Sequence, residues 1–180
     1  MKSGMTSPAI PVEDTTRALL RQMAATVAYR AAKVLRGPPA GFATMSFAPT
    51  TRRPVQIVAH MADLMTWGIS LARGDYVWKA EGSDDWDAEV RRFFDQLAVL
   101  DSELSGEGPF AGSVDKLIQG PLADALTHIG QLAMLRGMAG IPVRPESYAR
   151  AQIVPGRVGM EQAPPGKEFD GDASAVRQQP

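Results

Sequence analysis

One short apolar stretch of the chain carries four polar side chains of types that can bind a metal ion or a substrate. Residues 121–137 read "PLADALTHIGQLAMLRG", and the polar side chains are those of Asp124, Thr127, His128 and Gln131. Their spacing of i, i+3, i+4 and i+7 places them in a single stripe if the stretch is helical. A carboxylate and an imidazole one turn apart, with Cβ atoms about 6 Å apart, can reach one divalent cation.

His60 is the other imidazole that could take part, because the chain contains only two histidines. On a helix it lines up with apolar residues such as Leu64 and Leu71, at the apolar edge of that helix. A buried imidazole needs partners for both ring nitrogens. The pattern therefore predicts that His60, Asp124 and His128 converge on one point, shielded from solvent, where they hold a divalent metal.

Two interpretations without a metal remain open. The stripe around His128 can be the water-facing side of an amphipathic helix, although it lacks the Lys and Glu that such stripes usually carry. His60 can be a core histidine bonded to a backbone carbonyl or to Asp63.

Other familiar sites lack their defining residues. The absence of cysteine excludes disulfides, zinc fingers, iron–sulfur clusters and cysteine nucleophiles. The sequence also has no Glu-x-x-His motif of di-iron bundles, no H-E-x-x-H motif and no glycine-rich phosphate loop.

Arginines raise a separate question about partners. Arg136 lies in an apolar helical pattern, so we expect it to pair with an acidic side chain or to bind a substrate carboxylate. Arg91 and Arg92 are interpreted as part of a solvated face.

The composition is that of an ordinary globular protein. A chain of 180 residues is expected to form one domain with a real core. A net charge of -1, from 19 basic and 20 acidic side chains, gives no reason to expect nucleic acid or a membrane surface as a partner. The sequence also lacks an apolar run of about 18 residues and a secretory signal. We therefore expect a cytoplasmic protein that acts on a small-molecule substrate.

Four segments show the apolar periodicity of helices, and no strand pattern precedes residue 140. The helical segments are residues 12–35, 53–72, 85–104 and 121–138. Gly37 and the prolines after it end the first segment, and Pro54 opens the second. Connections of about ten or more residues mean that the helices need not follow an up-down order.

This pattern predicts an all-α fold, a four-helix bundle with an irregular C-terminal extension. Residues 1–11 are expected to form a flexible N-terminus, residues 12–140 the bundle, and residues 141–180 an extended, partly disordered arm. The fourth helix is apolar nearly all round, which indicates either a central helix or a homodimer interface.

Within the arm, Tyr148, Ile153 and Val154 are expected to pack against the bundle. Residues 160–180 have the composition of a mobile tail.

The segments "VQIVAHMADLMTWG" and "DALTHIGQLAMLRGMAGIP" resemble the DinB/YfiT-like superfamily of bacterial four-helix bundles. The resemblance covers residues 12–141, and its most specific part is the run from His128 through Gly130 and Gln131. The family has one histidine in the second helix and a His-x-x-x-His pair in the fourth, which together hold one divalent metal. His60 and His128 match this pattern, whereas Asp124 stands where the family has the first histidine of the pair.

The resemblance implies a metal-dependent hydrolase, or a transferase that uses a low-molecular-weight thiol. It implies that the two histidines and Asp124 hold Zn, Ni, Fe or Mn, and that a bound water or thiol is the nucleophile. Thr127 and Gln131 would lie beside the ligands and orient them or the substrate. Arg136 is a further candidate for binding the substrate.

The aspartate at position 124 also leaves a non-enzymatic alternative. A family member with a decayed metal site would be a small-molecule-binding or homodimeric scaffold protein.

Overall fold

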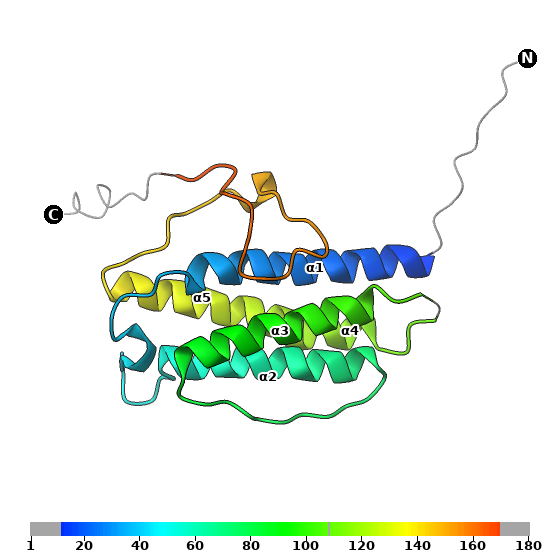
Figure 1. Ribbon diagram of the computed structural model, residues 1–180, viewed down its shortest axis with the longest axis horizontal. Helices are drawn as coiled ribbons and strands as arrows, with labels where there is room; N and C mark the ends of the chain where they lie inside the picture. The colour runs from blue at the N-terminus through cyan, green and yellow to red at the C-terminus, as the bar shows by residue number, and fades with distance from the viewer. Residues whose placement is uncertain (1–11, 108, 170–180) are drawn as a thin grey trace, which may run out of the picture.

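The computed structural model describes residues 12–107 and 109–169, which form a bundle of four long helices (Figure 1). The long helices are α1 (Val12–Leu35), α2 (Pro54–Ala72), α3 (Trp86–Leu104) and α5 (Ala123–Met138). The short elements are η1 (Phe42–Thr44), α4 (Val114–Leu117), η2 (Ile118–Leu122) and η3 (Tyr148–Arg150). The predicted all-α bundle is confirmed, and the described residues contain only an isolated β-bridge between Glu146 and Glu168.

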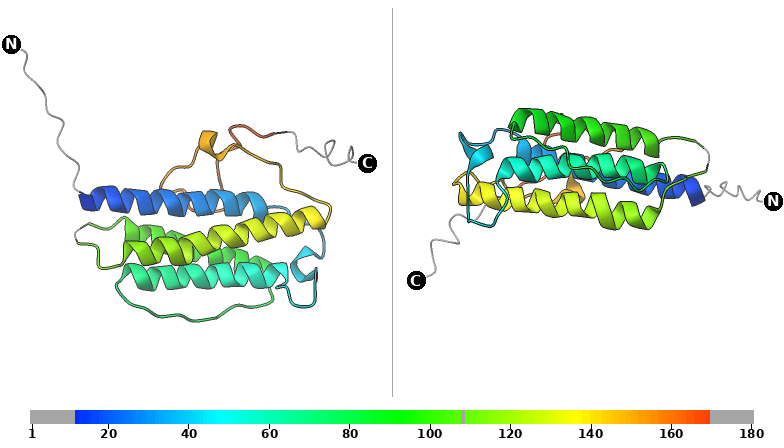
Figure 2. Two further views of the ribbon diagram at one scale, coloured as in Figure 1. Left: turned by 180° about the vertical axis from the view of Figure 1, so that it is seen from behind. Right: turned by 90° about the horizontal axis from the view of Figure 1, so that it is seen from below.

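The helices do not follow an up-down order. In Figures 1 and 2, α1 and α5 run in one direction along the bundle, and α2 and α3 both run in the other. Residues 73–85 make this possible, because they return along the outside of α2 from one end of the bundle to the other. We refer to residues 73–85 as the crossover segment.

The core lies where the buried faces of the four long helices meet. In α3 the predicted apolar stripe is buried at Phe93, Leu97, Leu100 and Leu104, while Trp86 and Val90 pack at its edge. Each fully buried large apolar side chain contributes about 2 kcal/mol relative to exposure. This shared core fixes α2 and α5 side by side, and both carry the candidate ligands.

Local hydrogen bonds set where α2 and α3 begin. Pro54 is the first residue of α2, and the side-chain oxygen of Gln56 accepts a hydrogen bond from the Arg53 N–H at 2.9 Å. The carboxylate of Asp85 accepts from the Ala88 N–H at 3.0 Å and caps α3. These caps satisfy backbone donors that a helix start otherwise leaves free.

The helical chain before α5 begins earlier than the sequence pattern predicted. The pattern starts the fourth helix at Pro121, whereas α4 begins at Val114, and the chain bends at Gly120 (φ -88°, ψ -107°). A Cβ atom on Gly120 would lie 2.9 Å from the ring of Trp67. Glycine at this position therefore lets the bend pass close to α2.

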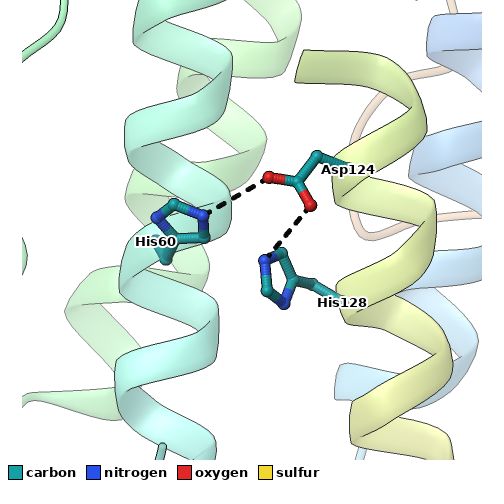
Figure 3. Close-up of side chains that lie close together, drawn as sticks. All are labelled: His60, Asp124 and His128. Carbon is teal, nitrogen blue, oxygen red and sulfur yellow. Dashed lines mark ion pairs between the residues drawn. The ribbon is translucent and has the colours of Figure 1, made fainter. Parts of the chain in front are cut away.

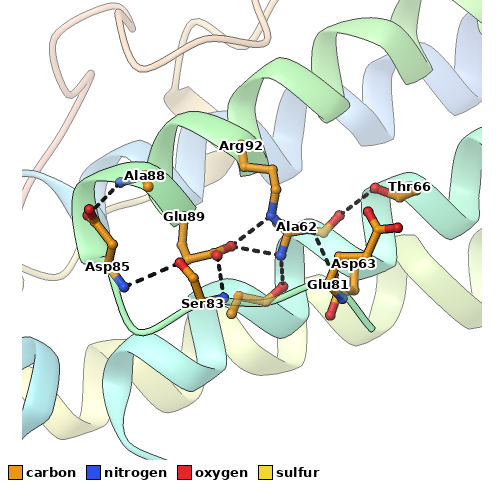
Figure 4. Close-up of polar contacts among 10 residues, drawn as sticks. Ala62, Asp63, Thr66, Glu81, Ser83, Asp85, Ala88, Glu89 and Arg92 are labelled. Carbon is orange, nitrogen blue, oxygen red and sulfur yellow. Dashed lines mark hydrogen bonds and ion pairs between the residues drawn. The ribbon is translucent and has the colours of Figure 1, made fainter. Parts of the chain in front are cut away.

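A group of charged side chains holds the crossover segment against α2 and α3 (Figure 4). Arg92 donates to Asp63 at 2.7 Å and to Glu89 at 2.8 Å. The same carboxylates accept backbone N–H bonds from the crossover segment, Asp63 from Glu81 and Glu89 from Ser83. The interpretation of Arg92 as part of a solvated face is therefore wrong, because its guanidinium neutralises two buried carboxylates.

Arg136 has backbone carbonyls as its partners. It is 6% exposed and donates to the carbonyls of Val34 and Arg36 at 2.8 Å and of Gly37 at 3.2 Å. Gly37 has a left-handed φ of 55°, so the predicted end of α1 is confirmed. A cation suits this place because helix C-termini carry a partial negative charge.

The described part of the C-terminal arm, residues 141–169, lies across α1 and is anchored there by a buried carboxylate (Figure 1). Glu146 accepts hydrogen bonds from Tyr29 and Lys33, each at 2.7 Å, and Lys33 also donates to Glu168 at 2.8 Å. Burial alone would raise the pKa of Glu146, but these hydrogen bonds and the charge of Lys33 outweigh it, and the pKa lies below the ordinary 4.5.

The arm differs in part from the sequence prediction. Tyr148 packs edge-on against Tyr29, with ring centroids 6.3 Å apart, and Ile153 is half-buried. Val154 is 47% exposed, so its predicted packing is wrong, and Val158 is buried instead. Glu168 belongs to the predicted mobile tail, residues 160–180, yet its carboxylate pairs with Lys33. Residues 170–180 lie outside the described part of the chain, and so does the predicted flexible segment 1–11.

Candidate metal centre

His60, Asp124 and His128 lie together between α2 and α5, with the carboxylate facing both imidazoles (Figure 3). Asp124 Oδ2 is 3.5 Å from His60 Nε2, and Asp124 Oδ1 is 3.4 Å from His128 Nε2. The convergence of these three residues that the sequence predicts is therefore present.

The spacing of the three groups fits a small divalent ion. A tetrahedral ion with bonds of about 2.1 Å holds its ligand atoms about 3.4 Å apart. Each imidazole Nε2 lies at about this distance from one of the two oxygens of Asp124, and one ligand atom from each residue lies within 4.8 Å of the others. Three protein ligands would leave positions open for a water or a substrate.

Gln131 orients the ring of His128, so that Nε2 faces the carboxylate. Its side-chain oxygen is 2.7 Å from His128 Nδ1. An amide oxygen only accepts, so in this hydrogen bond Nδ1 is the donor. His128 Nε2 then faces the carboxylate of Asp124 at 3.4 Å, where it can bind a metal ion or donate to the carboxylate when it carries a proton.

The surroundings of His60 favour its neutral form, which is the form that binds a metal ion. Burial lowers the pKa of His60 below its ordinary 6.5, and the charges of Arg52 and His128 act in the same direction, against a smaller opposing effect of Asp124. Trp78 packs edge-on against the His60 ring, with centroids 5.7 Å apart. The interpretation of His60 as a histidine paired with Asp63 is not supported, because Asp63 is engaged by Arg92.

The site is more open than expected. The side chain of Asp124 is 42% exposed, that of His60 is 20% exposed and that of His128 is 8% exposed. The prediction of a point shielded from solvent is therefore wrong, because Asp124 lies at the outer edge where α2 and α5 meet. A small molecule can reach the group from outside.

The remaining predicted site residues lie in different surroundings. Gln131 contacts His128, as described above. Thr127 is exposed, and its hydroxyl donates to the carbonyl of Ala123 at 3.1 Å within its own helix. Arg136 lies near the other end of α5, and its guanidinium is occupied by the carbonyls at the end of α1. The predicted substrate-binding role of Arg136 is therefore wrong.

Two cavities flank the three ligands. One of about 410 Å³ lies on the side of His128, and its lining includes Arg52, Ile57, Gln131, Met134 and Leu135. The other, of about 340 Å³, lies on the side of His60 under the crossover segment, and its lining includes Gln56, Asp63 and Asp84. Volumes of this size accommodate small molecules.

Sequence patterns did not reveal two residues near the site, Arg52 and Trp78. Both lie outside the helices, so no helical periodicity marks them. Only Trp78 left a signal in the sequence. It belongs to an apolar run, Tyr76 to Trp78, within an otherwise polar connection between helices.

Comparisons of the chain with family models, curated proteins and solved structures give no match. Among the described residues, no helix combines the length and apolarity needed to cross a membrane. The functional assignment therefore rests on the geometry of the three residues.

Proposed function

We propose that this protein is a metal-dependent enzyme of the DinB-like type, with one divalent metal held by His60, Asp124 and His128. The observation that carries the proposal is the arrangement of two imidazole Nε2 atoms around one carboxylate, at 3.4 and 3.5 Å. The orientation of His128 by Gln131 supports it, because Nε2 faces the carboxylate of Asp124.

A bound divalent cation would lower the pKa of a water or thiol beside it and stabilise negative charge that develops on the substrate. The chain itself supplies the rest of the site. The two histidines and Asp124 fix the position of the cation, and the open edge at Asp124 admits the substrate. The proposed reaction is hydrolysis, or transfer of a low-molecular-weight thiol, on a small molecule in the cytoplasm. The metal is Zn, Ni, Fe or Mn, the ions that suit imidazole and carboxylate ligands.

A second candidate function is supported by one feature of the site. Asp124 can bridge the two imidazoles without a metal if one ring is protonated, because each Nε2 already lies within 3.5 Å of a carboxylate oxygen. The protein would then be a non-catalytic small-molecule-binding or homodimeric scaffold protein.

Metal content separates the two candidates. We expect protein purified without chelator to contain one metal ion per chain by elemental analysis, and one of the four ions to raise the melting temperature of the chelator-treated protein. Asp124→Asn and His128→Ala should each lose the ion, because each removes one of three ligands. Thr127→Ala is the matched control, since its hydroxyl bonds only within α5.

The Asp124→Asn variant keeps the test valid if His128→Ala folds poorly, because Asp124 is partly exposed and its replacement leaves the core intact. Metal-free native protein whose melting temperature none of the four ions changes would overturn the metal assignment and favour the scaffold.

A further inference from the structure

The lining of the 410 Å³ cavity beside His128 combines apolar side chains with the guanidinium of Arg52. Ile57 and Leu135 are buried and contribute aliphatic surface, and Met134 is 62% exposed and adds a flexible apolar side chain. Met134 stands one turn beyond Gln131 on α5, so the apolar surface begins next to the candidate metal ligand His128. An apolar group of a bound molecule would remove this surface from water.

Arg52 supplies the charge. It lies just before α2 and lines the same cavity as His128. In the described part of the chain, neither an ion pair nor a hydrogen bond engages its side chain, whereas the neighbouring Arg53 pairs with Asp84 at 2.9 Å. None of the residues that line the cavity is acidic. A guanidinium with free donors can hold a carboxylate or a phosphate through two parallel hydrogen bonds.

The metal would add to this preference. A divalent cation held by one carboxylate and two neutral imidazoles retains a net positive charge, and Arg52 adds another on the same cavity. Both charges attract an anion and would place it beside the reacting position.

We infer that the substrate of this site is a small amphipathic anion. Its carboxylate or phosphate pairs with Arg52, and its apolar part lies against Ile57, Met134 and Leu135, next to His128. This inference deepens the proposed function by naming its substrate class, but the cavity and Arg52 do not themselves depend on the metal.

Binding of simple amphiphiles tests the inference. The probes are hexanoate, hexyl phosphate and the uncharged hexanamide, titrated into metal-loaded and chelator-treated protein and followed by NMR chemical shifts and calorimetry. We expect both anions to bind more tightly than hexanamide in either form of the protein. The anion that binds more tightly, hexanoate or hexyl phosphate, shows whether the substrate carries a carboxylate or a phosphate.

Two pairs of variants locate the contacts. Arg52→Gln should weaken binding of the preferred anion about three- to tenfold, whereas Arg53→Gln should leave it unchanged. Met134→Gln should weaken it about threefold, whereas Met138→Gln, which is equally exposed at 62% but does not line the cavity, should not. Metal content should be the same in all four variants, because none of them replaces a ligand.

The outcomes separate this inference from the metal assignment. If the protein holds no metal but the anion still binds through Arg52, the cavity assignment stands and the metal assignment fails. If the protein holds metal but hexanamide binds as well as the anions, or Arg52→Gln behaves like Arg53→Gln, the substrate inference is overturned. Failure of all three probes to bind at millimolar concentration would overturn it as well.

Discussion

At the scale of single residues, Gln131 has the most specific role in the site. Its side-chain oxygen lies 2.7 Å from His128 Nδ1, which orients the ring so that Nε2 faces the other two candidate ligands. Partners of this kind orient metal-ligating histidines and raise their basicity. Gln131 therefore acts on the candidate metal through His128 and is a positioning residue.

Replacing Gln131 should weaken metal binding without removing a ligand. We expect Gln131→Ala to lower the affinity for the bound ion about 10- to 100-fold, measured by competition with a chromophoric chelator. Gln131→Glu should restore binding, because a carboxylate also accepts the Nδ1 proton. Nitrogen NMR of the His128 ring should show a mixture of tautomers in Gln131→Ala alone.

Thr127→Ala, which lies in the same helix stripe, is the control. Equal metal affinity of Gln131→Ala and the unchanged protein would mean that the contact with His128 does not orient a ligand.

At the scale of elements, the position of α5 depends on contacts at both of its ends. Near its start, the bend at Gly120 packs against Trp67 of α2. Near its end, Arg136 ties α5 to the carbonyls that close α1. Burial lowers the pKa of Arg136, since no acidic group among the described residues offsets the loss of water, although the guanidinium remains charged at neutral pH. These contacts hold Asp124 and His128 opposite His60.

Arg136→Met should lower the free energy of unfolding by about 2–3 kcal/mol, because it leaves the buried carbonyl of Val34 without its donor. Urea denaturation measures this loss. Arg91→Met, at an exposed position of α3, should change stability by less than about 0.5 kcal/mol. Loss of metal or anion binding by folded Arg136→Met, without loss of stability, would instead restore a substrate role for this residue.

At the scale of the whole molecule, two segments outside the helices complete the structure. The crossover segment covers α2 and is held by Arg92 and its carboxylates (Figure 4). The C-terminal arm covers α1 and is held by Glu146, which lies within reach of both Tyr29 and Lys33. Both segments are held by buried carboxylates that accept hydrogen bonds from several donors.

The anchor of the arm should depend on pH. Because the pKa of Glu146 in the folded protein lies below its ordinary 4.5, the stability it contributes is present above that value and is lost as the pH falls through the folded pKa. At neutral pH, Glu146→Gln should lower the free energy of unfolding by about 2 kcal/mol, measured by urea denaturation.

The difference between the two proteins should shrink as the pH falls below 4.5, since the protonated glutamic acid then resembles glutamine. A difference that stays constant with pH would contradict an ionised anchor.

The sequence by itself determined the helices and the identity of the three candidate ligands. Apolar periodicity, Pro54, Asp85 and Gly37 are local features, and they place helix ends within a few residues because capping depends on neighbours in the chain. The i, i+4 spacing of Asp124 and His128 likewise guarantees that they share a helix face.

Only the tertiary structure decided which partners distant side chains have. Arg92 and Arg136 both read as arginines on helices, yet one neutralises buried carboxylates and the other caps a helix end. Arg52, the exposure of Asp124 and the path of the crossover segment depend on how α2, α3 and α5 pack. The physical reason is that burial and long-range hydrogen bonds come from the packing of whole elements, which no local spacing encodes.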